Sequence, residues 1–111
     1  MVLRAVAACL RRTLRQSDLV GRIGGEEFSI LLPDTTLDSA RRVAETVREA
    51  IEAIMPEVGE TRLRVTANIG VAADRPLLIS IAELQRQADE AMYAAKRQGR
   101  NRVTCLDATL G

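Results

Sequence analysis

Apolar residues recur every three or four positions in three stretches of the chain, which is the period of an amphipathic helix. The first stretch covers residues 2–15, and the second covers residues 40–54. The third lies between Ser80, which forms a capping box with Glu83, and Gly99, which suits a helix C-terminus. The apolar positions of this third stretch are Ile81, Leu84, Ala88, Ala91, Met92 and Ala95.

The remaining apolar runs are short and predict strands. Residues 18–23 and 26–32 flank a glycine pair, which indicates a hairpin with a two-residue turn. Residues 62–72 alternate between apolar and polar positions, as in a strand with one buried face. Residues 101–106 follow as a last short strand. The order is helix, hairpin, helix, strand, helix, strand, so we expect one α+β domain over residues 1–111, with a mostly antiparallel sheet flanked by helices.

Composition narrows the function classes. The chain has 111 residues, of which 47% are hydrophobic and 28% charged, and its formal net charge is +1. There is no apolar run long enough for a membrane span and no secretory signal pattern, so we expect a cytoplasmic protein with no direct membrane contact. The near-neutral charge and the presence of only two aromatic residues, Phe28 and Tyr93, argue against a nucleic-acid partner.

The cysteines predict no metal centre and no disulfide. Cys9 and Cys105 lie near opposite ends of the chain, and the sequence contains no histidine. A zinc site of the usual kind is therefore excluded. We interpret both residues as free thiols.

The hairpin turn is the first candidate for chemistry, in the stretch "RIGGEEFSI" at residues 22–30. Gly24 and Gly25 allow a bulky ligand to approach the backbone closely. The adjacent carboxylates of Glu26 and Glu27 suit a hard cation such as Mg²⁺, although in a regular strand they point to opposite faces. The alternative interpretation is a glycine turn with solvated glutamates.

Two further segments also admit two interpretations each. Arg15 and Asp18 can grip a guanine edge or a phosphate, or they can form a local ion pair. Residues 96–102, "KRQGRNR", place four cations and an asparagine around a glycine. They can hold a polyphosphate, or they can offset the macrodipole at a helix C-terminus.

In this order, the segments resemble the GGDEF domain family, the diguanylate cyclases. "RIGGEEFSILLPD" is similar to the signature hairpin of the family, with glutamate in the third motif position. "RQSD" stands ahead of it, where the family has its inhibitory RxxD motif. "VTANIGVA" and "ADEAMYAAKRQGRNRV" resemble a later strand and the closing helix of the family. Four ordered motifs over nearly the whole chain make the resemblance specific. It implies a nucleotidyl cyclase-like fold with a ferredoxin-like palm.

The resemblance also implies an activity in bacterial second-messenger signalling. Two GTP-loaded domains face each other as a homodimer, and each GTP 3′-hydroxyl attacks the α-phosphate of the other, giving cyclic di-GMP and pyrophosphate. Glu26 is then a ligand of Mg²⁺ or Mn²⁺ and the catalytic proton acceptor, and Glu27 supports the metal site. Gly24 and Gly25 let the nucleotide lie against the hairpin.

Cationic residues take the remaining roles that the resemblance implies. Lys96 and Arg100 hold GTP phosphates. Arg15 and Asp18 bind cyclic di-GMP, the product, as an inhibitory feedback site. The physical requirement is the neutralisation of charge that develops during phosphoryl transfer.

The resemblance begins part-way along the family's domain. Family members start with a strand that carries a metal-binding aspartate, followed by groups that read guanine and by a lysine that helps to hold phosphate. This chain starts in the family's second helix. We therefore expect the isolated chain to be inactive, to expose an unpaired strand edge beside the hairpin, and to need the missing N-terminal part as a partner. The alternatives are a cyclic di-GMP receptor that uses the RxxD site, and a remnant without function.

Overall fold

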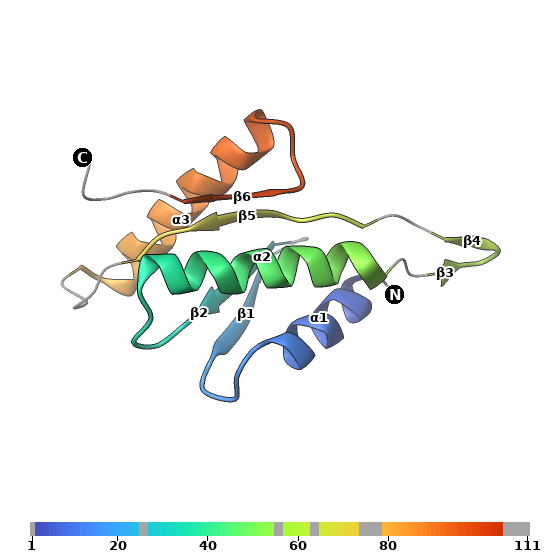
Figure 1. The fold of residues 1–111 in the computed structure, drawn as a ribbon, viewed down its shortest axis with the longest axis horizontal. Helices are drawn as coiled ribbons and strands as arrows, with labels where there is room; N and C mark the ends of the chain where they lie inside the picture. The colour runs from blue at the N-terminus through green and yellow to red at the C-terminus, as the bar shows by residue number, and fades with distance from the viewer. Residues whose placement is uncertain (1, 25–26, 55–56, 63–64, 74–78, 106–111) are drawn as a thin grey trace.

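The computed structural model describes residues 2–24, 27–54, 57–62, 65–73 and 79–105. Its elements in chain order are α1 (Val2–Thr13), β1 (Leu19–Gly24), β2 (Glu27–Leu31), α2 (Leu37–Ile54), β3 (Glu57–Val58), β4 (Thr61–Arg62), β5 (Asn68–Val71), α3 (Ile81–Arg97) and β6 (Arg102–Cys105). Helix α2 runs along the middle of the molecule, with α1 and the β1–β2 hairpin below it and β5 and β6 above it in Figure 1. The predicted order of helices and strands is confirmed, and a short β3–β4 hairpin is added.

The helix ends follow local side-chain chemistry. Helix α1 ends at Thr13, two residues earlier than predicted, where the Thr13 hydroxyl donates to the Cys9 carbonyl at 2.8 Å. At the start of α2, the Thr36 hydroxyl accepts a hydrogen bond from the Ser39 amide at 3.2 Å, as an N-cap does.

The ends of α3 agree with the sequence signals. The Ser80 side chain accepts from the Glu83 amide at 3.0 Å, which confirms the predicted cap. Gly99 follows the C-cap residue Gln98 and has φ +123°, a conformation that only glycine adopts readily. The predicted apolar stripe is wrong at its first position, because Ile81 is 53% exposed.

The β1–β2 hairpin is antiparallel, and its register runs from Leu19↔Leu31 to Gly24↔Glu27. A β-bulge between Arg22 and Gly24 shifts the register by one residue. Gly24 is therefore a paired strand residue, and the prediction that it lies in the turn is wrong.

The second strand pairing is parallel. Strands β5 and β6 pair from Asn68↔Arg102 to Val71↔Cys105, and α3 is the crossover between them. A parallel pair needs such a long connection. The other two pairings, β1–β2 and β3–β4, are antiparallel, as expected for most of the sheet. Strand β5 is shorter than the predicted strand over residues 62–72, since residues 65–67 and 72 form no strand and residue 62 belongs to β4.

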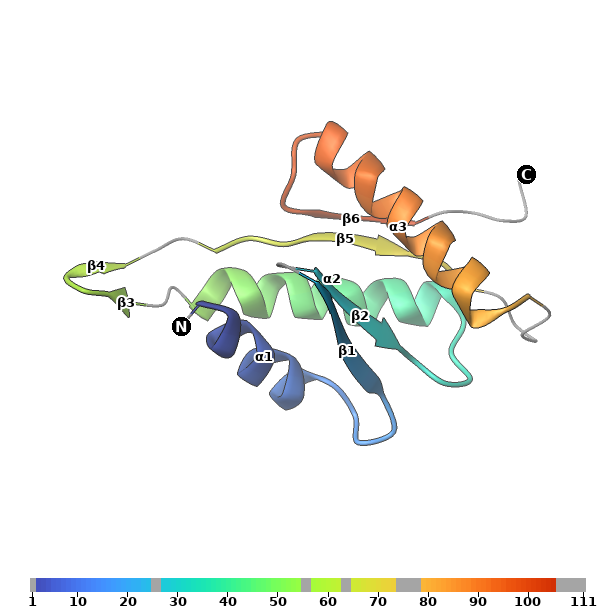
Figure 2. The same ribbon diagram turned by 180° about the vertical axis from the view of Figure 1, so that it is seen from behind.

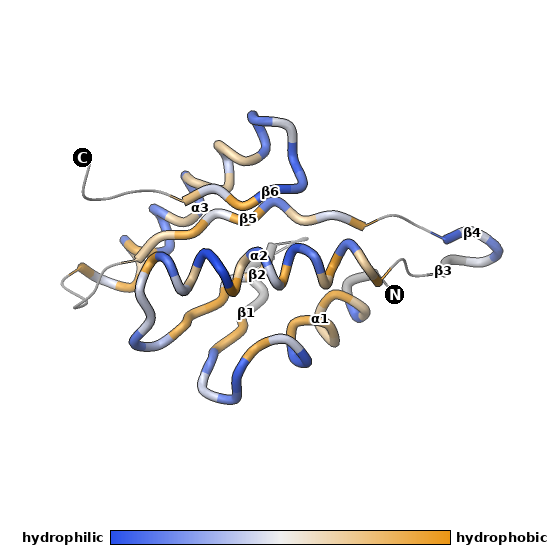
Figure 3. Tube along the Cα trace, in the orientation of Figure 1, coloured by the Kyte–Doolittle hydropathy of each residue, from blue (hydrophilic) through white to orange (hydrophobic). Residues whose placement is uncertain are grey.

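The core is built on one side of α2. Buried Val47 and Ile51 of α2 pack with Cys9 and Leu10 of α1, and residues of β2 and β5 cover this cluster. Nearer the N-terminus of α2, Ala40 and Ala44 pack against Val71 of β5 in a second buried cluster. Figure 3 shows the apolar positions recurring along α1 and α2, as the sequence pattern predicts. Helix α2 is thus the element on which the hairpin and the parallel pair are both assembled.

The other face of β5 lies against α3. A Cβ atom on Gly70 would collide with the backbone of α3, with the Ala88 carbonyl oxygen, the Met92 nitrogen and, at 2.8 Å, the carbonyl carbon of Ala91. Ala91 and Ala95 are buried at this contact side of α3. The absence of a side chain at Gly70 therefore sets the distance between helix and strand, and Figure 2 shows α3 crossing β5 and β6.

The sheet is divided into separate pairs. In the described part of the chain, β2 is hydrogen-bonded only to β1, and β5 only to β6. Both strands nevertheless contribute residues to the same core, Phe28 and Ile30 from β2 and Ile69 from β5. The hairpin and the parallel pair are therefore joined through α2 and the side-chain core, not through a continuous ladder.

Candidate functional site

The tip of the β1–β2 hairpin carries the predicted metal-binding carboxylates. Gly24 closes the described part of β1 and is paired with Glu27. Gly25 and Glu26 lie outside the described residues, and only the backbone of Glu27 is described. Across the described ranges, no group of three or more His, Cys, Asp or Glu side chains could hold a metal ion. The metal-binding and catalytic roles of Glu26 and Glu27 stay predictions.

Arg15 and Asp18 are brought together directly after α1. The Asp18 carboxylate accepts from the Arg15 backbone amide at 2.8 Å and from the Arg15 Nη2 at 3.2 Å. The Asp18 side chain is only 2% exposed, whereas that of Arg15 is 62% exposed. The local ion pair predicted as one alternative is therefore formed, and it still leaves more than half of the Arg15 side-chain surface open to solvent. Arg15 is the group of this pair that a ligand would meet first.

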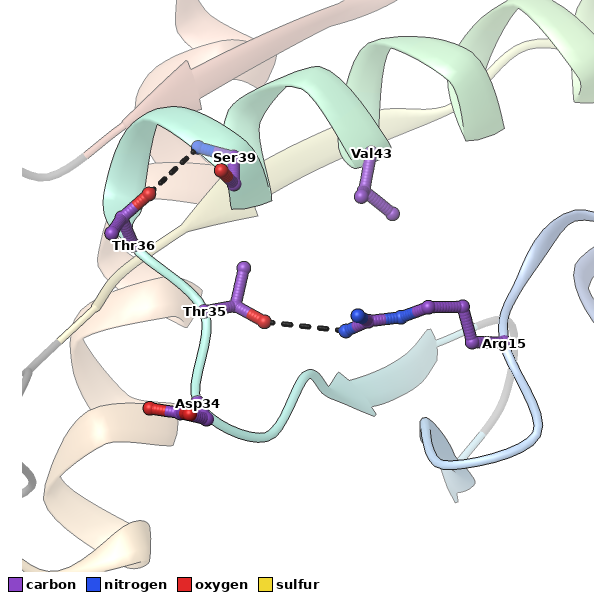
Figure 4. Close-up of a pocket in the computed structure, with 6 residues that line it drawn as sticks. All are labelled: Arg15, Asp34, Thr35, Thr36, Ser39 and Val43. Atoms are coloured by element: carbon purple, nitrogen blue, oxygen red, sulfur yellow. Dashed lines mark hydrogen bonds between the residues drawn. The ribbon is translucent and has the colours of Figure 1, made fainter.

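A cavity of about 380 Å³ opens beside Arg15. It is lined by Arg15, Asp34, Thr35, Thr36, Ser39 and Val43. Figure 4 shows the Arg15 side chain reaching across the cavity towards the Thr35 hydroxyl, with a 3.4 Å hydrogen bond from Nη2 to Oγ1. Sequence reasoning missed this site because Arg15 and Thr35 are 20 residues apart, and no sequence pattern links them.

Lys96 and Arg100 lie at the C-terminal end of α3 and in the turn that leads from α3 to β6. Lys96 is in the last turn of α3, and its Nζ is 5.5 Å from the centroid of the Tyr93 ring. Arg100 is exposed in the turn after the helix, with φ +66°. Figure 3 shows polar positions gathering at this end of α3. Helix-dipole compensation and phosphate binding are both compatible with this position, and the phosphate role stays a prediction.

Asn101, in the turn after α3, is hydrogen-bonded to both β5 and α2. Its backbone amide donates to Asn68 Oδ1 of β5 at 2.8 Å. Its side-chain oxygen accepts from Arg48 Nη1 of α2 at 3.2 Å, and its Nδ2 donates to Glu52 of the same helix. Asn101 has φ +45°, a left-handed conformation that asparagine tolerates better than most residues. The sequence indicated a polar turn here, but not that the turn is tied to α2 and β5.

The cysteines are both free, as predicted, with Cys9 buried and Cys105 half-buried. Burial raises the pKa of the Cys105 thiol above its usual range. A thiol with a raised pKa stays protonated at neutral pH and is a poor nucleophile. Cys105 is therefore a packing residue at the end of β6, and it is no candidate for covalent catalysis.

None of the described helices is both long and apolar enough to cross a bilayer.

Comparison with known sequences identifies the family of the chain. The sequence model described as "Diguanylate cyclase, GGDEF domain" matches residues 1–102. The chain therefore belongs to the GGDEF domain family. It is 47% identical over 103 residues to diguanylate cyclase DgcM of Escherichia coli strain K12, covering 92% of this chain and 24% of that protein. It is 41% identical over 102 residues to diguanylate cyclase DgcP of Pseudomonas aeruginosa, covering 92% of this chain and 15% of that protein.

Solved structures confirm the α+β GGDEF fold. Diguanylate cyclase SiaD of Pseudomonas aeruginosa, in complex with its activator SiaC, superposes with a TM-score of 0.88 at 39% identity, covering 95% of this chain and 40% of SiaD. The GGDEF domain of Caulobacter crescentus DgcB, in complex with c-di-GMP, superposes with a TM-score of 0.82 at 30% identity, covering 94% of this chain and 62% of that chain. The active GGEEF domain of a Vibrio cholerae diguanylate cyclase superposes with a TM-score of 0.82 at 32% identity, covering 96% of this chain and 67% of that chain. The chain thus spans part of a GGDEF domain and about a quarter or less of the two curated relatives.

Proposed function

We propose that this chain takes part in the condensation of two GTP molecules to cyclic di-GMP. The observation that carries the proposal is the family match over residues 1–102, which includes the whole signature hairpin. In this reaction each 3′-hydroxyl oxygen forms a bond to the α-phosphorus of the opposite GTP, the hydroxyl proton leaves, and pyrophosphate departs. The two reacting nucleotides require two such domains, so we propose a homodimer as the catalytic state. We propose that the reaction takes place in the cytoplasm, because its substrate is GTP.

We propose that the hairpin tip and the α3 terminus supply the charges for this reaction. Glu26 and Glu27 offer hard oxygen donors that fit Mg²⁺ or Mn²⁺, and the metal when bound would neutralise charge on the phosphates. Glu26 accepts the proton of the attacking hydroxyl. Gly24 and Gly25 leave room for the nucleotide against the hairpin. Lys96 and Arg100 hold phosphate oxygens from the helix end.

We propose that a further strand completes the site between β2 and β5. Support comes from the pairing, because within the described residues each of these strands is hydrogen-bonded on one side only, while both pack on the core that α1 and α2 form. The resemblance implies that the family has an aspartate-bearing strand beside the hairpin, which agrees with this proposal. With that strand, the carboxylates of the hairpin gain the missing ligand.

Replacing Glu26 tests the catalytic proposal. The chain is fused behind the preceding part of the Vibrio cholerae GGEEF domain, of which it covers 67%, to supply the strand. We expect the fusion to convert GTP to cyclic di-GMP with Mg²⁺, and Glu26→Gln to lower kcat by about 100-fold or more, because it keeps the shape and removes the charge. The product is measured by chromatography.

A matched control for this test is Glu90→Gln. Glu90 is an exposed residue of α3 whose carboxylate lies 3.4 Å from Arg86. Its replacement removes the same charge away from the hairpin and leaves turnover unchanged. Full activity of the Glu26→Gln fusion would refute the role of Glu26, and an inactive wild-type fusion would refute the completion of the site by that strand.

A second function, binding of cyclic di-GMP by Arg15 and Asp18, is favoured by the cavity beside the exposed guanidinium. This site lies wholly within the described residues and does not need the hairpin tip. We propose that it is an inhibitory product site in a complete cyclase and a receptor site in the isolated chain. A cyclic dinucleotide offers two phosphodiesters and two guanine edges, and a guanidinium can form paired hydrogen bonds with either.

Removing the Arg15 guanidinium tests this second function. We expect the 111-residue chain to bind cyclic di-GMP in isothermal titration, and Arg15→Ala to weaken binding by about tenfold or more, since a charge-assisted hydrogen bond is lost. Arg86→Ala is the control, because Arg86 is an exposed arginine of α3 that is paired with Glu83. Thermal melting of both variants shows whether they stay folded. Equal affinities of wild type and Arg15→Ala would contradict the proposed site.

A further inference from the structure

The Arg15 side chain is held from two directions. The buried Asp18 carboxylate accepts from Nη2 at 3.2 Å on the α1 side. The Thr35 hydroxyl accepts from the same nitrogen at 3.4 Å, from the turn that leads into α2. Both acceptors contact the end of the guanidinium, and Figure 4 shows the Arg15 side chain extended towards Thr35. The position of the charge beside the cavity is therefore set by Thr35 together with Asp18.

The Thr35 hydroxyl is fixed as an acceptor for Arg15. A hydroxyl has one hydrogen to donate, and that of Thr35 is donated to the Pro33 carbonyl at 2.9 Å. Its lone pairs are then left for Nη2 of Arg15. Because the hydrogen is committed to the backbone of the same turn, the oxygen stays directed at the guanidinium. The neighbouring Thr36 hydroxyl has a different partner, because it accepts from the Ser39 amide at 3.2 Å as the N-cap of α2.

The cavity presents a surface suited to a polar, negatively charged group. One wall is the Arg15 guanidinium, and the opposite wall carries the hydroxyls of Thr35 and Ser39, with Val43 closing one side. Asp34 also lines the cavity, but its carboxylate is directed away from Arg15 in Figure 4. A phosphodiester oxygen that enters between Arg15 and Ser39 would meet donors from both.

We infer that Thr35 is a positioning residue for the cyclic di-GMP site, and that the cavity beside it receives a phosphodiester of that ligand. The inference rests on the proposed binding of cyclic di-GMP by Arg15. Thr35 acts through Arg15: its hydroxyl keeps the guanidinium extended over the cavity before the ligand arrives, so that less side-chain freedom is lost on binding. The proposed site thus includes Thr35 in addition to the arginine and the aspartate of the RxxD motif.

Isothermal titration of the 111-residue chain with cyclic di-GMP tests the inference. Thr35→Val keeps the shape of the side chain and removes the hydroxyl, and we expect a three- to tenfold weaker affinity, about the value of one hydrogen bond. Thr35→Ser keeps the hydroxyl and restores the affinity to within about twofold of wild type. The control is Thr46→Val, because Thr46 is an exposed residue of α2 whose hydroxyl donates only to the Arg42 carbonyl of its own helix, at 3.1 Å.

A double-mutant cycle separates positioning from general stability. If Thr35 acts through Arg15, Thr35→Val has no effect on affinity in an Arg15→Ala background. An equal loss in both backgrounds, or an affinity of Thr35→Val equal to that of wild type, would overturn the inference while leaving the proposed ligand in place. Absence of binding by the wild-type chain would refute the proposed ligand and this inference with it.

Discussion

Gly70→Ala is expected to destabilise the protein strongly by forcing α3 away from β5. The added Cβ would meet backbone atoms of Ala88, Ala91 and Met92, and backbone cannot swing aside as a flexible side chain can. Helix α3 must then move away from β5, which opens the contact that buries Ala91 and Ala95. We expect a loss of about 3 kcal/mol or more in the free energy of unfolding. The thermal midpoint, followed by circular dichroism, should fall by more than about 10 °C.

The matched control for this variant is Gly59→Ala. Gly59 lies in the β3–β4 turn with φ +65°, and a Cβ there meets nothing within 4 Å. Its replacement measures the cost of a left-handed alanine alone, about 1–2 kcal/mol. A smaller effect at Gly70 than at Gly59 would mean that α3 and β5 can separate at little cost, which would contradict the close approach.

Asn101→Ala is expected to have the second largest effect on stability. The substitution removes the side-chain hydrogen bonds to Arg48 and Glu52, and it places alanine at φ +45°. The bonds contribute about 1–2 kcal/mol together, and the left-handed alanine adds about 1 kcal/mol. Urea unfolding should therefore show a loss of about 2–3 kcal/mol with an unchanged m value.

Two further variants divide this effect into its parts. Asn101→Gly keeps the left-handed backbone and loses the side-chain bonds, so it should fall between wild type and alanine. Gln98→Ala is the control, because among the described residues the Gln98 side chain accepts one long hydrogen bond, from Thr104 at 3.4 Å. A glycine variant as stable as wild type would show that the side chain of Asn101 does not hold the turn to α2.

The elements of this fold could be predicted because their signals are local. The helix start at Ser80 and the helix end at Gly99 depend on local backbone and side-chain chemistry, which the sequence displays directly, whereas the second helix begins at Leu37, three residues before its predicted start. The β3–β4 hairpin was not predicted, because two-residue strands have no period to detect. Gly24 was placed in the turn because a bulge, which shifts the register, cannot be deduced from a glycine pair.

The candidate site was only partly accessible to sequence reasoning. Arg15 and Asp18 are three residues apart, so their ion pair could be anticipated as one alternative. The contact of Arg15 with Thr35 and the network of Asn101 depend on segments that are 20 and more residues apart. Such contacts arise only after α1, α2 and β5 have packed, and no periodicity encodes them. The roles of Glu26 and Glu27 rest on family resemblance and stay predictions.

Because the sheet is divided, the free energy of unfolding of this protein should depend on the other molecules in the solution as well as on its own sequence. A strand that adds to the edges of β2 and β5 binds the folded chain and not the unfolded one. Its binding free energy is then added to the free energy of unfolding, by RT ln(1 + [L]/Kd). The melting temperature of the chain should consequently rise with the concentration of such a strand. A thermal shift would then report strand capture before any nucleotide is added.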